Sequence, residues 1–204
     1  MLFNSFIDIL KSRIGNQSFN AQKTMAPFHI GDRNKWLKSN PNPRLSAVML
    51  LIYPKDELAH IALIERPKYD GVHSGQIALP GGSKDNEDLN LEITALREVS
   101  EEIGIEKNIN VIGQLSDVYI PPSKFLVSPF IGILKNKPIF KKDDFEVEKI
   151  IEVPISLLFD DLIIKHGSVP VNKGNIKAPY FDIYGHKVWG ATAIIINEFK
   201  SIMK

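Results

Sequence analysis

Three glutamates, Glu98, Glu101 and Glu102, lie close together in the chain and could hold a divalent cation. Their spacing of i, i+3 and i+4 places them on one face of a helix, with Cβ atoms about 5–6 Å apart. Like charges at this spacing oppose helix formation, and carboxylates are unfavourable in the last turn before Gly104, the predicted helix end. A helix that carries these unfavourable charges at one place indicates that the glutamates have a functional role. Carboxylate oxygens are the ligands that Mg²⁺ or Mn²⁺ prefers.

Two glycines before the glutamates favour the same interpretation. Gly81 and Gly82 would let the backbone approach the ion, and Gly82 is a candidate to supply a carbonyl ligand. The alternative is a solvated glutamate face on which Arg97 neutralises Glu101 at i+4. The three glutamates alone leave both interpretations open, and the glycine pair favours the metal site.

The same stretch predicts the helix that must position these side chains. Ile93, Leu96, Val99 and Ile103 recur at steps of three, three and four, which is the spacing of one stripe on a 3.6-residue helix. We therefore expect these four side chains to form the buried face of the helix.

The helix and the residues before it resemble the Nudix box. Its pattern is Gly, five residues, Glu, seven residues, then Arg-Glu-apolar-any-Glu-Glu-any-Gly-apolar, and here Gly82, Asp88 and the run Arg97–Ile105 occupy these positions. Asp88 replaces the first Glu of the pattern, and eight residues rather than seven precede Arg97. Both departures are familiar in the coenzyme A pyrophosphatase branch of the superfamily. The resemblance implies that Arg97 orients the box glutamates and that Glu98 is a candidate catalytic base.

The segment before the box is similar to the same branch. The run His73–Gly82, His-Ser-Gly-Gln-Ile-Ala-Leu-Pro-Gly-Gly, resembles the sequence that precedes the box in coenzyme A pyrophosphatases. The resemblance implies that Arg66, His73 and Gln76 contact the substrate. Without it, His73 or Gln76 would be a turn residue that satisfies local backbone groups.

One cation of that family pattern is absent. The pattern has a Leu-Arg pair three residues before the histidine, where this chain has Asp70 and Gly71. We expect Lys68 or Lys84 to supply a positive charge for a substrate phosphate in its place.

Two later segments hold further candidates. Phe125 lies in a proline-containing loop that could close over a ligand, or it anchors that loop to the core. Glu146 and Glu148 lie in a charged run, and most such runs are solvated. In Nudix enzymes an acidic residue from a late loop often completes the metal or base shell, so the resemblance makes both glutamates candidates for the catalytic base.

The composition excludes several classes of function. The 204 residues include 25 Lys and Arg against 24 Asp and Glu, so no overall charge would attract nucleic acid or an anionic membrane. The absence of cysteine excludes disulfides, thiolate zinc sites and a cysteine nucleophile. The sequence lacks a secretory signal, and no apolar segment approaches the roughly 18 residues of a membrane span. We expect a cytoplasmic protein that binds neither nucleic acid nor membrane.

The predicted organisation is one domain with an N-terminal extension. Apolar residues at helical spacing through residues 2–14 predict a helix that ends near Gly15 and packs on the domain or on a second subunit of a homodimer. We assign residues 1–20 to this extension and residues 21–204 to a Nudix hydrolase domain. Residues 16–44 are polar and contain three prolines, which predicts an irregular connection.

The rest of the chain predicts an α/β fold. Strands are expected at Ser46–Tyr53, His60–Glu65, Val111–Val118, Pro129–Leu134 and Tyr180–Tyr184. A short helix is expected at Pro154, and a final helix after Trp189. Strands and helices that interleave without strict alternation indicate a mixed sheet with helices on both faces. The resemblance, which covers about residues 22–200, implies the Nudix-type α/β/α sandwich.

The function implied by the resemblance is metal-dependent hydrolysis of a diphosphate linked to a nucleoside. The small-molecule substrate expected from the segment before the box is coenzyme A or an acyl-CoA, split into 3′,5′-ADP and a 4′-phosphopantetheine product. One alternative is a Nudix pyrophosphatase for ADP-ribose, dinucleotides or nucleoside triphosphates. A non-catalytic, nucleotide-sensing Nudix domain ranks last, because such a domain would be expected to have lost box glutamates.

Overall fold

The computed structural model describes residues 1–15, 19–27, 42–70, 73–171 and 174–203. The helices are α1 (Phe3–Arg13), α2 (Phe19–Thr24), α4 (Leu91–Ile103), α5 (Ile155–Leu158), the 3₁₀ helix η1 (Asp161–Ile163) and α6 (Gly190–Met203). The strands are β1 (Arg44–Lys55), β2 (Leu58–Glu65), β3 (Ile77–Ala78), β4 (Gly81–Ser83), β5 (Asn110–Gln114), β6 (Val118–Ile120), β7 (Phe125–Ile133), β8 (Lys149–Pro154), β9 (Ile164–Val171), β10 (Gly174–Ile183) and β11 (His186–Val188).

The main sheet is mixed, as predicted. Its central path is β3-β2-β1-β7-β5, with β4 paired to β1, β6 to β7 and β8 to β2. β1 runs parallel to β7 and antiparallel to β2 and β4. A second, three-stranded antiparallel sheet has the order β11-β10-β9.

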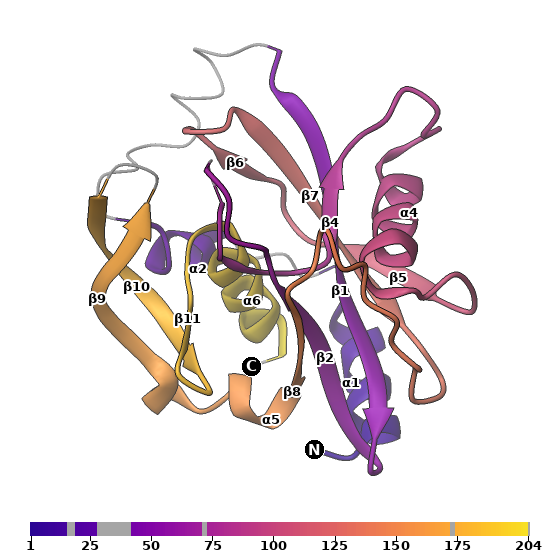
Figure 1. Cartoon of the computed structure of the whole chain (residues 1–204). Coiled ribbons are helices and arrows are strands. Elements are labelled where there is room, and N and C mark those ends of the chain that lie inside the picture. The colour runs from indigo at the N-terminus through magenta and orange to yellow at the C-terminus, as the bar shows by residue number, and fades with distance from the viewer. Residues whose placement is uncertain (16–18, 28–41, 71–72, 172–173, 204) are drawn as a thin grey trace.

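Alternate residues of β1 face two separate cores, which gives the fold its three layers. Met49 and Leu51 pack in one core together with Ala95 and Val99 of α4. Leu50 belongs to the other core, which holds the buried faces of α1 and α6 (Figure 1). Because successive strand side chains point to opposite faces, a central strand buried on both sides reads as a continuous apolar run. The predicted α/β/α sandwich is therefore confirmed.

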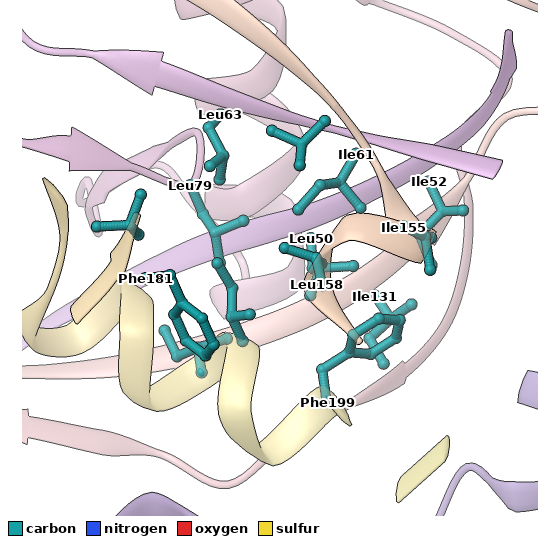
Figure 2. Packing of buried hydrophobic residues seen from close by; sticks show 14 of the residues in the cluster. Leu50, Ile52, Ile61, Leu63, Leu79, Ile131, Ile155, Leu158, Phe181 and Phe199 are labelled. Carbon is teal, nitrogen blue, oxygen red and sulfur yellow. The ribbon is translucent and has the colours of Figure 1, made fainter. Parts of the chain in front are cut away.

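The larger core connects the main sheet to the C-terminal part of the chain. Figure 2 shows Phe181 of β10 and Phe199 of α6 beside Leu50, Ile61 and other side chains of the sheet. Both phenylalanines are fully buried. The second sheet is thereby fixed to the main sheet through α6 and a shared apolar core.

Helix α1 is part of this larger core. Phe6 and Leu10 are fully buried within it, and the Phe3 amide donates a hydrogen bond to the Glu57 carbonyl in the β1–β2 turn. The helix ends at Arg13, as the sequence predicted to within two residues. The division of the chain after residue 20 stays a prediction, and that boundary falls inside α2.

The prediction of an irregular connection at 16–44 is wrong in part. Helix α2 lies within it, and β1 begins at its end, while residues 16–18 and 28–41 lie outside the described part. Tertiary contacts hold α2: the Gln22 side chain donates to Glu198 at 2.6 Å and the Asn197 side chain donates to the Ala21 carbonyl. A helix of six residues is unstable alone, so its sequence carries little signal of it.

Most other predicted elements agree with the structure to within four residues, but β10 begins six residues before the strand predicted at Tyr180–Tyr184, and the strands β3, β4, β8, β9 and β11 were not predicted. The single strand predicted at Val111–Val118 is instead β5 and β6, two short strands that pair with different parts of β7. The pairing with β7 is irregular at a bulge between Val111 and Gly113 of β5, and it is interrupted between the end of β5 and the start of β6. Among the described residues, no helix is long and apolar enough to cross a membrane.

Candidate active site

The helix that carries the box glutamates begins and ends as its sequence dictates. Asn90 is its N-cap and accepts a hydrogen bond from the Ile93 amide at 2.9 Å. Gly104 ends it in the left-handed conformation, with φ of 73°, and its amide donates to the Ser100 carbonyl at 3.0 Å. A side chain is disfavoured at this φ, which explains the glycine.

The buried face of α4 differs from the predicted stripe. Val99 and Ile103 are fully buried as expected, but Leu96 is half-buried and Ile93 is 40% exposed. The buried face consists of Thr94, Ala95, Glu98, Val99, Glu102 and Ile103. It is rotated towards the glutamates, because their carboxylates lie against β4. A hydrophobic pattern cannot report a face that polar side chains share.

Both glycines of β4 are required by close approaches. A Cβ on Gly82 would lie 2.4 Å from the Glu98 Oε1 atom, and one on Gly81 would lie 2.3 Å from the Ala47 carbonyl. The Gly81 amide donates to Glu102 Oε2 at 2.8 Å. Glycine at position 82 therefore leaves room for the Glu98 carboxylate, and glycine at position 81 lets β4 lie close to β1 with its amide bonded to Glu102.

Three carboxylates converge beside this strand. One oxygen each from Glu98, Glu102 and Glu146 lies within 4.8 Å of the others, although Glu146 comes from the loop between β7 and β8. Oxygens this close repel one another unless a proton or a cation lies between them. The donor set of hard oxygens and the glycine cradle fit Mg²⁺ or Mn²⁺.

The three carboxylates line a cavity of about 490 Å³. Its acidic lining residues are Asp85, Glu98, Glu101, Glu102 and Glu146, and its basic ones are Arg66 and Arg97. An anionic substrate would be repelled by this excess of carboxylates. The cavity therefore suits an anion only when cations accompany it.

Burial raises the pKa values of the two innermost glutamates. Removal from water raises the pKa of Glu102 to about 8, and the nearby Arg66 and the Gly81 amide offset this only in part. Burial also raises the pKa of Glu98, against the effect of Arg97. Both carboxylates are thus under-compensated by the protein alone, as expected of groups that bind a cation.

Arg97 connects the box helix to the loop before it. Its guanidinium donates two hydrogen bonds to Asp88, at 3.1 and 3.0 Å, and further bonds to Glu98 at 3.0 Å and Glu101 at 2.6 Å. These bonds hold the pKa of Asp88 well below its usual range. Asp88, at the departure from the box pattern, is buried and also accepts from the Thr94 hydroxyl at 2.9 Å.

Arg66 also lines the cavity, beside Gly81 and Glu102. It donates to the Gly81 carbonyl at 2.8 Å and lies 3.6 Å from a Glu102 oxygen. Its side chain is 28% exposed, so the guanidinium also faces the cavity. The position fits the predicted contact with substrate.

His73 and Gln76 lie beside a second cavity rather than the first. It has a volume of about 280 Å³, and its lining residues are Tyr69, Asp70, His73, Ser74 and Gln76 together with Pro170 and Val171 of β9. The His73 Nδ1 atom lies 3.0 Å from Gln76 Oε1, and His73 has a positive φ of 70°. Tyr69 lines both cavities, so the two adjoin there. Gly71 lies outside the described residues.

Other predicted site residues are not brought to the carboxylate cluster. Glu101 lines the cavity but bonds Arg97, and Glu148 is exposed, with its amide bonded to the Glu65 carbonyl. Lys84 lies before α4 and donates to the Asp88 carbonyl at 2.7 Å. Phe125 begins β7 and packs against the core beneath the Arg44 guanidinium, 4.3 Å from its ring centroid.

Sequence reasoning missed three residues around the cavity. Tyr69 and Phe145 line it with exposed aromatic rings, and Asp143 shapes the loop that carries Phe145 and Glu146. Asp143 accepts from the amides two and three residues later, a local pattern typical of aspartate in turns. That signal is present in the sequence, whereas the exposure of the two aromatic rings depends on the fold.

Comparison with known proteins agrees with this geometry. A family model described as the NUDIX domain matches residues 43–162. A NudL protein of Photorhabdus laumondii, named as an uncharacterized Nudix hydrolase, is 35% identical over 77% of this chain and 83% of its own length. The same-named protein of Yersinia enterocolitica is 31% identical over 77% of this chain and 80% of its own.

A solved structure shares the fold at low identity. The NUDIX domain of Shewanella oneidensis NrtR, in complex with ADP ribose, has a TM-score of 0.57 and 15% identity, covering 85% of this chain and 99% of that one. The family model spans more than half of the chain and includes the glycine pair, the box helix and Glu146. This chain therefore belongs to the Nudix hydrolase family.

Proposed function

We propose that this protein hydrolyses the diphosphate of coenzyme A or an acyl-CoA in the presence of Mg²⁺ or Mn²⁺, giving 3′,5′-ADP and a 4′-phosphopantetheine product. The observation that carries the hydrolytic part is the convergence of Glu98, Glu102 and Glu146 within 4.8 Å in a cavity of about 490 Å³. Nudix enzymes generally use divalent metals.

The metal would be held by Glu98 and Glu102 of this cluster, with Glu146 beside it as the candidate base. When bound, the metal supplies positive charge to the diphosphate oxygens and acidifies a water. Gly82 leaves room for the Glu98 carboxylate, and Arg97 orients Glu98 and Glu101 through hydrogen bonds. The predicted carbonyl contact from Gly82 and the ligand role of Glu101 belong to this proposal.

The protein's own groups would position the phosphates and move the proton. Arg66 lies beside Glu102 with its guanidinium towards the cavity, and would bind a phosphate oxygen. Glu146 is the exposed member of the cluster and would accept a proton from the attacking water. Glu98 is the alternative base, because its carboxylate lies in the same cluster as that of Glu146. It is the more deeply buried of the two.

The coenzyme A assignment is supported by the segment His73–Gly82 and by the second cavity that this segment lines. Coenzyme A extends from its diphosphate in two directions, so a site for it needs more room than the diphosphate cavity. The 280 Å³ cavity adjoins the first at Tyr69 and offers polar groups from His73 and Gln76. A pantetheine arm, which carries amides and a hydroxyl, suits such a lining.

The test is a substrate panel with product identification. The full chain with Mg²⁺ or Mn²⁺ is incubated with coenzyme A, dephospho-coenzyme A, ADP-ribose, a dinucleoside polyphosphate and nucleoside triphosphates. We expect kcat/KM to be about tenfold higher for coenzyme A than for dephospho-coenzyme A, the effect of one charge-assisted contact to the 3′-phosphate. Equal values would mean that this phosphate is not read.

Two other outcomes would decide between the alternatives. Faster hydrolysis of ADP-ribose than of either coenzyme would transfer the assignment to an ADP-ribose pyrophosphatase, a ligand class that NrtR binds in its solved complex. Binding without turnover of any substrate would indicate a nucleotide sensor.

A further inference from the structure

Phe145 is exposed at the edge of the diphosphate cavity without an evident structural role. Its side chain is 90% exposed, although it lines the same cavity as the three clustered glutamates. It directly precedes Glu146, a member of that cluster. A large apolar ring left in water beside a substrate cavity is more informative than a scattered surface residue.

The loop that carries Phe145 is fixed at both ends. The Asp143 amide donates to the Glu102 carbonyl at 3.0 Å, and Asp143 Oδ1 accepts from the amides of Phe145 at 2.8 Å and Glu146 at 3.0 Å. Val147 follows and is fully buried in the core that packs on α4. The ring is therefore exposed at a fixed distance from the carboxylate cluster.

The form of this surface indicates the ligand. At 90% exposure, most of the ring is accessible to a flat partner, and a nucleobase is flat and stacks on aromatic rings. Tyr69 lines both this cavity and the second one, so the space that continues past Tyr69 suits an extended chain.

We propose that Phe145 stacks against the nucleobase of the substrate and is a specificity-determining residue of this enzyme. This rests on the proposed function, since it places the adenine of a coenzyme at Phe145 and the rest of the molecule beyond Tyr69. One loop would then supply both Glu146 to the carboxylate cluster and Phe145 to the nucleobase.

The experiment compares two ligands that differ only in the base. AMP and ribose 5-phosphate are titrated with MgCl₂ into the wild type and into Phe145→Ala by calorimetry. We expect the wild type to prefer AMP and Phe145→Ala to lose about tenfold of that preference. In Phe145→Trp, AMP should change the tryptophan fluorescence and ribose 5-phosphate should not.

Ile139 provides the matched control. It is 92% exposed a few residues away and does not line the cavity, so Ile139→Ala should keep the wild-type preference and Ile139→Trp should give no response to AMP. An unchanged AMP preference in Phe145→Ala would overturn the proposal. So would a Phe145→Trp response to 4′-phosphopantetheine but not to AMP, which would place the arm at this ring. These measurements report binding and do not depend on turnover. Failure of the enzyme to hydrolyse coenzyme A would therefore contradict the proposed function without deciding the role of Phe145.

Discussion

Glu102 shows what the proposed metal site costs the metal-free fold. It is 1% exposed, bonded to the Gly81 amide and 3.6 Å from Arg66, yet burial still raises its pKa to about 8. At neutral pH the metal-free protein holds this carboxyl in its disfavoured charged form or takes up a proton. A divalent cation would remove that penalty.

This gives a prediction for stability against pH. Because the folded pKa of Glu102 is about 8 and its ordinary value is 4.5, the folded state gains from its protonation, and that gain is lost as pH rises through 8. In EDTA, the urea midpoint of the wild type should therefore fall relative to that of Glu102→Gln between about pH 5 and about pH 9. A constant difference between the two proteins would contradict the burial argument.

Glu102→Gln, which should favour the metal-free fold at high pH, should impair turnover. Removing a charge that acts through the metal should lower kcat by orders of magnitude while the fold stays intact. Full activity of Glu102→Gln in saturating Mg²⁺ or Mn²⁺ would exclude this residue from the metal site. Added metal should raise the melting temperature of the wild type more than that of the variant.

The two glutamates of the late loop should differ in their contribution to catalysis. Glu146 belongs to the carboxylate cluster, whereas Glu148 lies outside it with its amide paired to Glu65. A general base contributes roughly 10²–10⁴-fold, so Glu146→Gln should lower kcat by about that factor. Glu148→Gln is the matched control and should retain activity. Comparable losses in both would mean that the loop rearranges when substrate binds.

At the scale of elements, the loop from Asp143 to Val147 is held by one side chain, Asp143, which accepts two backbone hydrogen bonds within it. Asp143→Ala removes the acceptor of the Phe145 and Glu146 amides, whereas Asp143→Asn keeps an oxygen in its place. We expect Asp143→Ala to lower kcat by about tenfold or more and Asp143→Asn to restore most of it. Equal loss in both variants would show that the charge of Asp143, rather than its geometry, matters.

The elements around the site could be predicted where local signals and tertiary contacts agree. The box helix was predictable because its apolar spacing and Gly104 coincide with its end. Its buried face was not, because Glu98 and Glu102 occupy that face and carry no hydrophobic signal. Glu146 was a candidate only through the family resemblance. Its approach to α4 depends on long-range pairing of β8 with β2.

At the scale of the whole molecule, the site depends on a sheet that is packed on both faces. The core on one side fixes α4, and the core on the other includes α1, α6 and part of the second sheet. The second sheet brings Pro170 and Val171 to the second cavity, opposite the loop of His73. No local pattern could predict this juxtaposition, because it arises from the packing of α6 between the two sheets.

The last prediction concerns whether the N-terminal helix is an extension or part of the cooperative unit. Phe6 is fully buried and its ring centroid lies 6.1 Å from that of Phe199 in α6. Phe6→Ala should lower the free energy of unfolding by about 3–5 kcal/mol, in a single urea transition. Ile9→Ala, on the exposed side of α1, is the control and should change it by less than about 1 kcal/mol.

A double-mutant cycle makes the test specific to the contact between α1 and α6. Because the two rings touch the same core, the combined loss in Phe6→Ala with Phe199→Ala should be smaller than the sum of the single losses by roughly 0.5–1.5 kcal/mol or more. Additive losses, or a separate early transition that Phe6→Ala alone shifts, would mean that α1 folds and unfolds independently. In that case residues 1–20 would be a detachable extension, and the catalytic layer would not depend on them.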